Sequence, residues 1–164
     1  MRKAYVVVAM VLFAVPGISP LPSRAEVASV EAATAPGGEV EYLDSAEASA
    51  QLADVYARAG LVEDAIGEYR RSIELDPTRA DRHFRLGLAY QSQRWFDEAL
   101  EAYREAARLE PESAWARAAM SIVQAKMGQR SAAFQTYRQV KSIDEEVARE
   151  LLEVLLRYGS FHDA

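Results

Sequence analysis

The sequence predicts an all-α fold in which antiparallel helix pairs stack side by side, and three observations predict it. From Ser45 onward, apolar residues recur at spacings of three and four, which is the period of one face of an α-helix. Proline occurs in that part of the chain only as Pro77 and Pro111, 34 residues apart. Matching residue types also return at a shift of 34, and a fixed period of this length indicates an array of helical repeats.

The repeat is carried by small and aromatic residues at corresponding positions. They are Ala65, Ala99 and Ala133 and, four residues after each of them, Tyr69, Tyr103 and Tyr137. Because alanine carries little bulk, the second helix of each pair is expected to lie close to the first, with the tyrosines filling the gap between units. A lone pair cannot bury both of its faces, so the units must stack.

Each unit divides into two predicted helices. The first helices are expected over 46–58, 80–92 and 114–126, and the second helices over 62–75, 96–109 and 130–143. Gly60 and Gly128 follow first helices, where a residue free to adopt a positive φ ends a helix. Arg94 takes that place in the middle unit, and we expect its turn to be made differently. Pro77 and Pro111 end second helices because proline cannot continue the hydrogen-bond ladder.

A last helix is expected over residues 145–158. Leu151, Val154, Leu155 and Tyr158 form an apolar stripe along it, and charged residues fill most of the remainder. The last pair of a repeat array needs a cover for its outer face. We therefore interpret this segment as a capping helix.

These residues and their spacing resemble the tetratricopeptide repeat family. The signature positions of the first two units hold Leu52, Ala53, Tyr56, Ala65, Tyr69 and Pro77, then Leu86, Gly87, Tyr90, Ala99, Tyr103, Ala106 and Pro111. The third unit has Ser121, Gln124 and Glu145 where the family has small, aromatic and proline residues. The resemblance implies a right-handed α-solenoid of three antiparallel helix pairs plus a capping helix. Its repeats would span 46–79, 80–113 and 114–147, in a domain over 45–159 followed by a tail, 160–164.

Residues 1–25 have the pattern of a secretory signal peptide. Arg2 and Lys3 precede an apolar run over residues 4–15, and a small-x-small site ends at Ala25. A membrane span needs about 20 apolar residues, and a proline ends this run earlier. We expect cleavage after residue 25 and export, with the periplasm as the expected compartment. The alternatives are secretion and an uncleaved membrane anchor.

Residues 26–44 are expected to form a flexible linker between this segment and the repeats. They are acidic and rich in alanine, and the Pro-Gly-Gly sequence at 36–38 interrupts any helical stripe.

Composition excludes several classes of partner and site. Removing residues 1–25 removes three basic residues and no acidic one, which takes the net charge from −6 to −9. Such a charge repels phosphate backbones and anionic lipid, so we expect no nucleic-acid partner and no membrane-surface binding by the mature domain. The chain has no cysteine, which excludes disulfides, thiolate metal sites and a cysteine nucleophile.

No pattern of catalytic or cofactor-binding residues is found. Histidine occurs only at His83 and His162, too few for a histidine metal site. His83 is interpreted as a partly buried packing residue. Acidic residues on the helices alternate with arginine at helical spacing, as in Glu101 with Arg104, which is typical of a solvated face. We predict that the chain is not an enzyme and uses no metal and no cofactor.

The candidate site lies on the first helices, which the family resemblance places on the concave side of the solenoid, and on the capping helix that adjoins them. The apolar residues of the predicted protein-binding groove are Phe84, Leu88, Trp115, Ile122, Leu152 and Leu156, and its rim residues are Asp54, Asp81, Arg85 and Arg149. A second apolar stripe on helices that already have a core stripe suggests a ligand surface. Two alternatives remain: burial of these residues within the monomer, and coverage by the linker through Val40, Tyr42 and Leu43.

The sequence therefore predicts a non-enzymatic adaptor or scaffold of the cell envelope, which binds a protein or peptide partner along this groove. An amphipathic helix or an extended apolar segment fits such a surface. The alternative is a homo-oligomeric structural protein in which the apolar groove meets its own copy.

Overall fold

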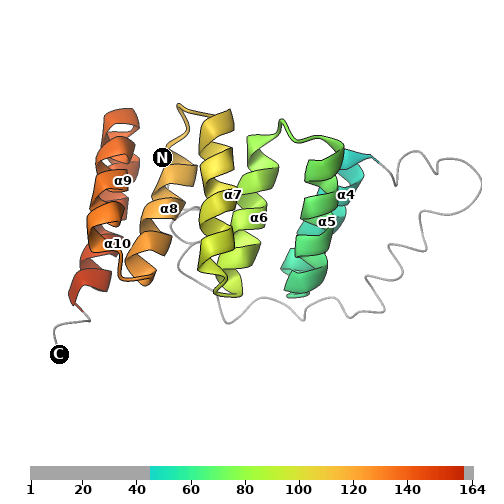
Figure 1. Ribbon diagram of the computed structural model, residues 1–164, viewed down its shortest axis with the longest axis horizontal. Helices are drawn as coiled ribbons and strands as arrows, with labels where there is room; N and C mark the ends of the chain where they lie inside the picture. The colour runs from blue at the N-terminus through green and yellow to red at the C-terminus, as the bar shows by residue number, and fades with distance from the viewer. Residues whose placement is uncertain (1–44, 161–164) are drawn as a thin grey trace, which may run out of the picture.

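The computed structural model describes residues 45–160, and within that range it contains seven α-helices and no strand. The helices are α4 (Ala46–Arg58), α5 (Val62–Leu75), α6 (Ala80–Ser92), α7 (Phe96–Leu109), α8 (Ala114–Lys126), α9 (Arg130–Ile143) and α10 (Glu145–Ser160). The pairs α4–α5, α6–α7 and α8–α9 stand in a row, and α10 lies at the end of the row beside α9 (Figure 1). The chain is thus an all-α helical-repeat solenoid.

The helix boundaries predicted from the repeat agree with the structure for all six helices of the three pairs. The last helix begins at Glu145 as predicted and continues two residues further. At the start of the array, the Ser45 side chain accepts a hydrogen bond from the amide of Ala48 at 3.1 Å, which caps α4. Residues 1–44 and 161–164, with the predicted signal segment, linker and His162, lie outside the described residues.

Small residues lie where the two helices of a pair approach each other. Ala65, Ala99 and Ala133 are fully buried, as the repeat predicts. In the third pair, the Ser121 hydroxyl donates to the Ala133 carbonyl at 2.7 Å. A hydrogen bond from a short side chain to a backbone carbonyl of the facing helix requires the two helix axes to lie close together. A larger side chain would not fit between helices this close, which explains the alanine at this position.

The third unit compensates for its departures from the repeat pattern with hydrogen bonds. Ser121 takes the small position and binds the facing helix through its hydroxyl. Gln124 takes the aromatic position, and its side-chain oxygen accepts a buried hydrogen bond from Thr136 at 2.8 Å. Polar residues are therefore buried here with partners.

The middle turn is made like the other two, which corrects the expectation for Arg94. Arg94 has φ 62°, beside 76° at both Gly60 and Gly128. In all three turns the amide of the next residue donates to the carbonyl five residues earlier, at 2.8 to 3.0 Å. This is the Schellman pattern of helix ends. The pair geometry imposes the left-handed conformation, and the arginine adopts it.

Replacing Arg94 with glycine is expected to raise the free energy of unfolding by about 0.5–1 kcal/mol. A residue with a Cβ pays about 1–2 kcal/mol in this conformation, and the greater freedom of glycine in the unfolded chain offsets part of that gain. Urea unfolding checks it. Arg94→Ala is the control, since it keeps a side chain at the positive φ and, like the glycine variant, removes the guanidinium that lies 5.9 Å from the Phe96 ring and acts on Lys126. Equal stability of the two variants would contradict the prediction.

One arginine ties the first two units together. Arg82 is 4% exposed, and its guanidinium donates to the Asp76 carboxylate at 3.1 Å and to the Glu47 carboxylate at 3.4 Å. It also donates to the backbone carbonyl of Asp76 at 3.3 Å. These partners belong to α4 and to the end of α5, so three helices meet at one buried charge.

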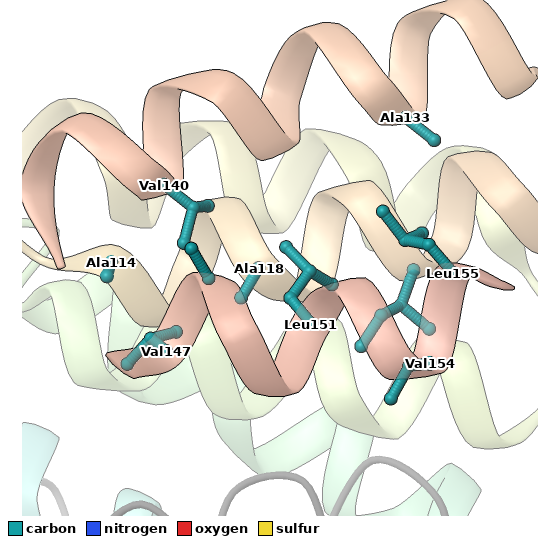
Figure 2. Close-up of a cluster of buried hydrophobic side chains, with 10 residues drawn as sticks. Ala114, Ala118, Ala133, Val140, Val147, Leu151, Val154 and Leu155 are labelled. Carbon is teal, nitrogen blue, oxygen red and sulfur yellow. The ribbon is translucent and has the colours of Figure 1, made fainter. Parts of the chain in front are cut away.

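The capping helix α10 packs against both helices of the third pair. Its buried side chains include Val147, Leu151, Val154 and Leu155, and they face α8 and α9 (Figure 2). A single residue, Asp144, joins α9 to α10, whereas four residues separate consecutive units. The Asp144 carboxylate accepts hydrogen bonds from the amides of Glu146 and Val147, at 2.9 and 3.0 Å, and so caps α10. Among the described residues, none of the helices has the length and apolar character that crossing a membrane requires.

Candidate protein-binding groove

A hollow of about 180 Å³ lies between the first turns of α6 and α8. Three of the predicted site residues line it, Asp81, Phe84 and Trp115. Asp81 and Trp115 occupy the same position in consecutive repeats, 34 residues apart. The repeat register thus brings together residues from two units, which the sequence alone places on separate helices.

The other walls of this hollow come from the end of α7 and the connection that follows it. Ala106, Glu110 and Ser113 contribute there, and none of the three is among the predicted site residues. Glu110 directly precedes Pro111 at the end of α7. Its place beside the groove follows from the turn of the chain between units, for which residue type gives no signal.

Two of the predicted groove residues lie in the seam between units. Phe84 is half-buried, with its ring centroid 5.5 Å from that of Tyr103. Leu88 is half-buried and packs against the cores on both sides of α8. Each presents one edge outward and contributes the rest of its surface to packing, so substitutions here alter stability together with any binding.

Ile122 does not belong to an open groove. It is 4% exposed, within the core that α8 forms with α9 and α10. Ala118, one turn earlier, is buried in the same core. The prediction that Ile122 faces a ligand is therefore corrected, because α10 packs against α8 as well as α9 and covers this part of the first-helix face.

The predicted site residues on α10 differ in exposure. Leu152 is half-buried, Arg149 is exposed, and Leu156 is 57% exposed. The open part of the first-helix face therefore runs from α4 to the beginning of α8. The remainder of α8 is covered by α10.

At the other end of this face, Asp54 receives two hydrogen bonds. The Tyr69 hydroxyl donates to one of its oxygens at 2.5 Å, and the Arg85 guanidinium donates to the other. Burial raises the pKa of Tyr69, and the bond to Asp54 raises it further. The hydrogen bond to Asp54 raises the pKa of Arg85. Asp54 and Arg85, two of the four predicted rim residues, thus form an ion pair. The positive charge of Arg85 is therefore largely neutralised within the domain.

Little in the described residues suggests chemistry. No group of three or more His, Asp or Glu side chains in that part of the chain is placed to hold a metal ion. His83 is half-buried, and its Nε2 lies 3.2 Å from the Pro77 carbonyl oxygen. In the next repeat, Arg117 donates to the Pro111 carbonyl at 2.6 Å. The side chain at this position therefore stabilises the turn between units in both repeats, which is a structural role.

Comparison with known families and structures agrees with this architecture. A tetratricopeptide repeat model matches residues 80–113, and a TPR repeat model matches residues 53–93. None of the curated proteins compared with the chain matches it.

Several solved structures share the fold. A crystal structure of MamA protein is 26% identical over 67% of this chain, with a TM-score of 0.62, and the match spans 60% of the MamA chain. The TPR2B domain of yeast Sti1, in a pHsp70 complex, is 20% identical over 70% of this chain and 95% of its own, with a TM-score of 0.64. The first TPR of Spaghetti (RPAP3), bound to the HSP90 peptide SRMEEVD, is 19% identical over 76% and 100%, with a TM-score of 0.62.

The family matches together cover residues 53–113, and the third pair continues the same period and the same turns. Residues 53–113 of the chain are tetratricopeptide repeats, and they belong to an all-α helical-repeat solenoid.

Proposed function

We propose that this chain is a non-enzymatic scaffold of the cell envelope that holds a segment of a partner protein along its first helices. The hollow between α6 and α8 carries the proposal, because two units contribute side chains to one concave site there. Two solved structures with the same fold and low identity are complexes, one with pHsp70 and one with an HSP90 peptide, which supports an interaction role for the architecture.

The walls of the hollow favour a particular anchor side chain. Phe84 and Trp115 are aromatic, while Asp81 and Glu110 are carboxylates. Lysine and arginine combine an apolar stem with a cationic head, and aromatic faces and carboxylates both attract such a head. A volume of about 180 Å³ holds roughly one large side chain. We infer that the partner segment is apolar with a basic anchor.

An acidic peptide suits this face poorly. Asp54 and Asp81 are carboxylates, and the one arginine of the predicted rim on α6, Arg85, already pairs with Asp54. The family resemblance implies basic and Asn residues where a terminal carboxylate is held, and this chain has Ala50, Asp54, Arg85, Ala118 and Ala119 there, of which one is basic. The partner is therefore expected to differ in charge from SRMEEVD.

Site-specific photo-crosslinking in the native envelope tests the face. A photoreactive residue at Asp81 is expected to capture a defined segment of one protein. The same group at Arg104, exposed on the second helix α7, is the matched control. A common set of products from both positions would contradict the proposal.

The captured segment is then measured against the purified protein. Asp81→Lys is expected to weaken its binding at least tenfold, by placing a positive charge beside the basic anchor. Unchanged affinity would exclude the hollow as the binding site. Asp81 has 47% of its side chain exposed and pairs with Arg79, so this substitution separates binding from stability better than one at Leu88.

Envelope localisation rests on residues 1–25 and is tested separately. Intact-mass measurement of the protein isolated from its host is expected to give a chain that begins at Glu26. A mature chain that still begins at residue 1 would favour the uncleaved anchor.

A further inference from the structure

A second and larger hollow, of about 420 Å³, lies between α5, α6 and α7 on the side of the second helices. Its floor is apolar: Ile73 and Tyr90 are half-buried, and Leu86 and Ala102 are buried. The exposed Trp95 ring packs against Tyr90 at a centroid distance of 5.9 Å. The hollow thus has an apolar floor with an exposed aromatic ring beside it.

The rim of this hollow is mainly acidic. Glu74 from α5 and Glu98, Glu101 and Glu105 from α7 line it, with Arg70 and His83 as the basic members. Glu101 and Glu105 pair with Arg104 and Arg108 on their own helix, and neither of those arginines lines the hollow. The hydrogen bond from Arg108 lowers the pKa of Glu105, so that carboxylate is charged at neutral pH. We call this site the acidic hollow.

The acidic rim is local to this place in the array. The residues 34 positions after Glu98, Glu101 and Glu105 are Ala132, Gln135 and Gln139. The third unit therefore repeats the helices without repeating the charge. Every charged residue from Ala114 to Ile143 is basic, namely Arg117, Lys126, Arg130, Arg138 and Lys141. The charge of the chain is separated along the solenoid.

The outer face of α9 carries an aromatic residue among basic ones. Arg130, Phe134, Arg138 and Lys141 are spaced by four, four and three residues, so they share one helix face, and all four are exposed. Phe134 is 41% exposed and makes an edge-on contact with the half-buried Tyr137. We call this face the basic stripe.

Phe134 is exposed because α10, and not the first helix of a further unit, follows the third pair. Its counterparts Ile66 and Leu100 are only 6% and 4% exposed. Each lies in a core with side chains from the first helix of the next unit. Ile66 is in a core with Leu86 and Ala89, and Leu100 is in a core with Ala119 and Val123. The core between α10 and the third pair uses Ala133 and Val140 of α9 and leaves Phe134 outside.

We propose that the basic stripe of one copy docks into the acidic hollow of a second copy. Phe134 would meet the apolar floor, and Arg138 and Lys141 would face the glutamates of the rim. The two surfaces belong to different units of one stack, so they can meet only between copies.

The two sides of this contact differ, so the interface is heterologous. A dimer formed in this way still presents one free stripe on one copy and one free hollow on the other, and such contacts build rings or open chains. This surface is separate from the first-helix hollow at Asp81, and the inference does not rest on the proposed function.

Two charge-reversal variants of the purified protein test the contact. The stripe variant carries Arg138→Glu and Lys141→Glu, and the hollow variant carries Glu74→Lys and Glu98→Lys. These glutamates are chosen because Glu101 and Glu105 have arginine partners on α7. All four positions are exposed, and circular dichroism checks that each variant is folded.

Sedimentation velocity over a concentration series at low ionic strength is the measurement. The wild type is expected to give a weight-average sedimentation coefficient that rises with concentration and falls as salt is added, since exposed charges are screened. Each variant alone is expected to associate at least tenfold more weakly. An equimolar mixture is expected to associate again, because the intact stripe of one variant meets the intact hollow of the other and the two reversed surfaces also have opposite charges.

Three results would overturn the proposal. A wild type that stays monomeric throughout the series would exclude self-association, even if a basic amphipathic peptide bound the hollow. Association that persists in both variants would place the contact elsewhere. A mixture of the variants that stays monomeric would show that stripe and hollow do not pair. Asp81→Lys is the control on the first helices, and its association is expected to match the wild type.

Discussion

Replacing Leu151 with alanine is expected to lower the free energy of unfolding by about 2–4 kcal/mol. The side chain is 2% exposed and lies in the core between α10 and the third pair (Figure 2). Removing buried leucine atoms loses their transfer free energy and leaves a cavity in a well-packed region. The loss also weakens the cover over Ile122, which the capping helix keeps from water.

Leu156→Ala is the matched control for this prediction. It makes the same chemical change on the same helix at a side chain that is 57% exposed, so the expected loss is under about 0.5 kcal/mol. Urea unfolding gives both values, and hydrogen exchange shows whether the amides of α9 and α10 lose protection together. Similar losses for the two leucines would mean that α10 contributes little to the stability of the array.

Replacing Gly87 with alanine is expected to destabilise the protein by about 1–2 kcal/mol. A Cβ at Gly87 would lie 2.5 Å from the Tyr103 ring. That ring is fully buried, packs against Phe84 and donates its hydroxyl to Gln91 at 3.1 Å. It cannot move aside without losing contacts, so α6 and α7 must separate. Overpacking of this kind costs about 1–3 kcal/mol, more than the helix propensity that alanine gains over glycine.

The matched control is Gly67→Ala, inside α5. A Cβ there meets nothing within 4 Å, so only the helix propensity remains and a gain of about 0.5–1 kcal/mol is expected. Opposite signs for one chemical change would show that contact with Tyr103 decides the effect. A stabilising Gly87→Ala would contradict the close approach of α6 and α7.

The helices of the array were predictable because each boundary has a local chemical cause. Pro77 and Pro111 end helices wherever they occur, and Gly60 and Gly128 supply a positive φ. The third-unit residues that break the pattern did not break the helices, because Ser121 and Gln124 find hydrogen-bond partners on α9. A repeat position can therefore hold a polar residue when the polar side chain finds a hydrogen-bond partner.

The candidate site was predictable in part. Asp81, Phe84 and Trp115 were selected by register and line one hollow, because the stacking of units follows from the repeat itself. Ile122 was selected by the same rule and is buried. The difference lies in α10, whose one-residue connection through Asp144 is unlike the four-residue connections of the repeat. A rule taken from repeating units does not describe the element that ends them.

The sequence by itself determined the period, the helices and the small residues at each crossing, because these depend on backbone conformation and side-chain size at neighbouring positions. Tertiary structure alone decided which surfaces remain open. It places Arg94 in the left-handed conformation and buries the guanidinium of Arg82 among three helices. It also leaves Phe134 exposed, whereas its counterparts Ile66 and Leu100 are buried. In each case the outcome depends on where a neighbouring helix lies, and that position is set by packing between units, which the local pattern does not contain.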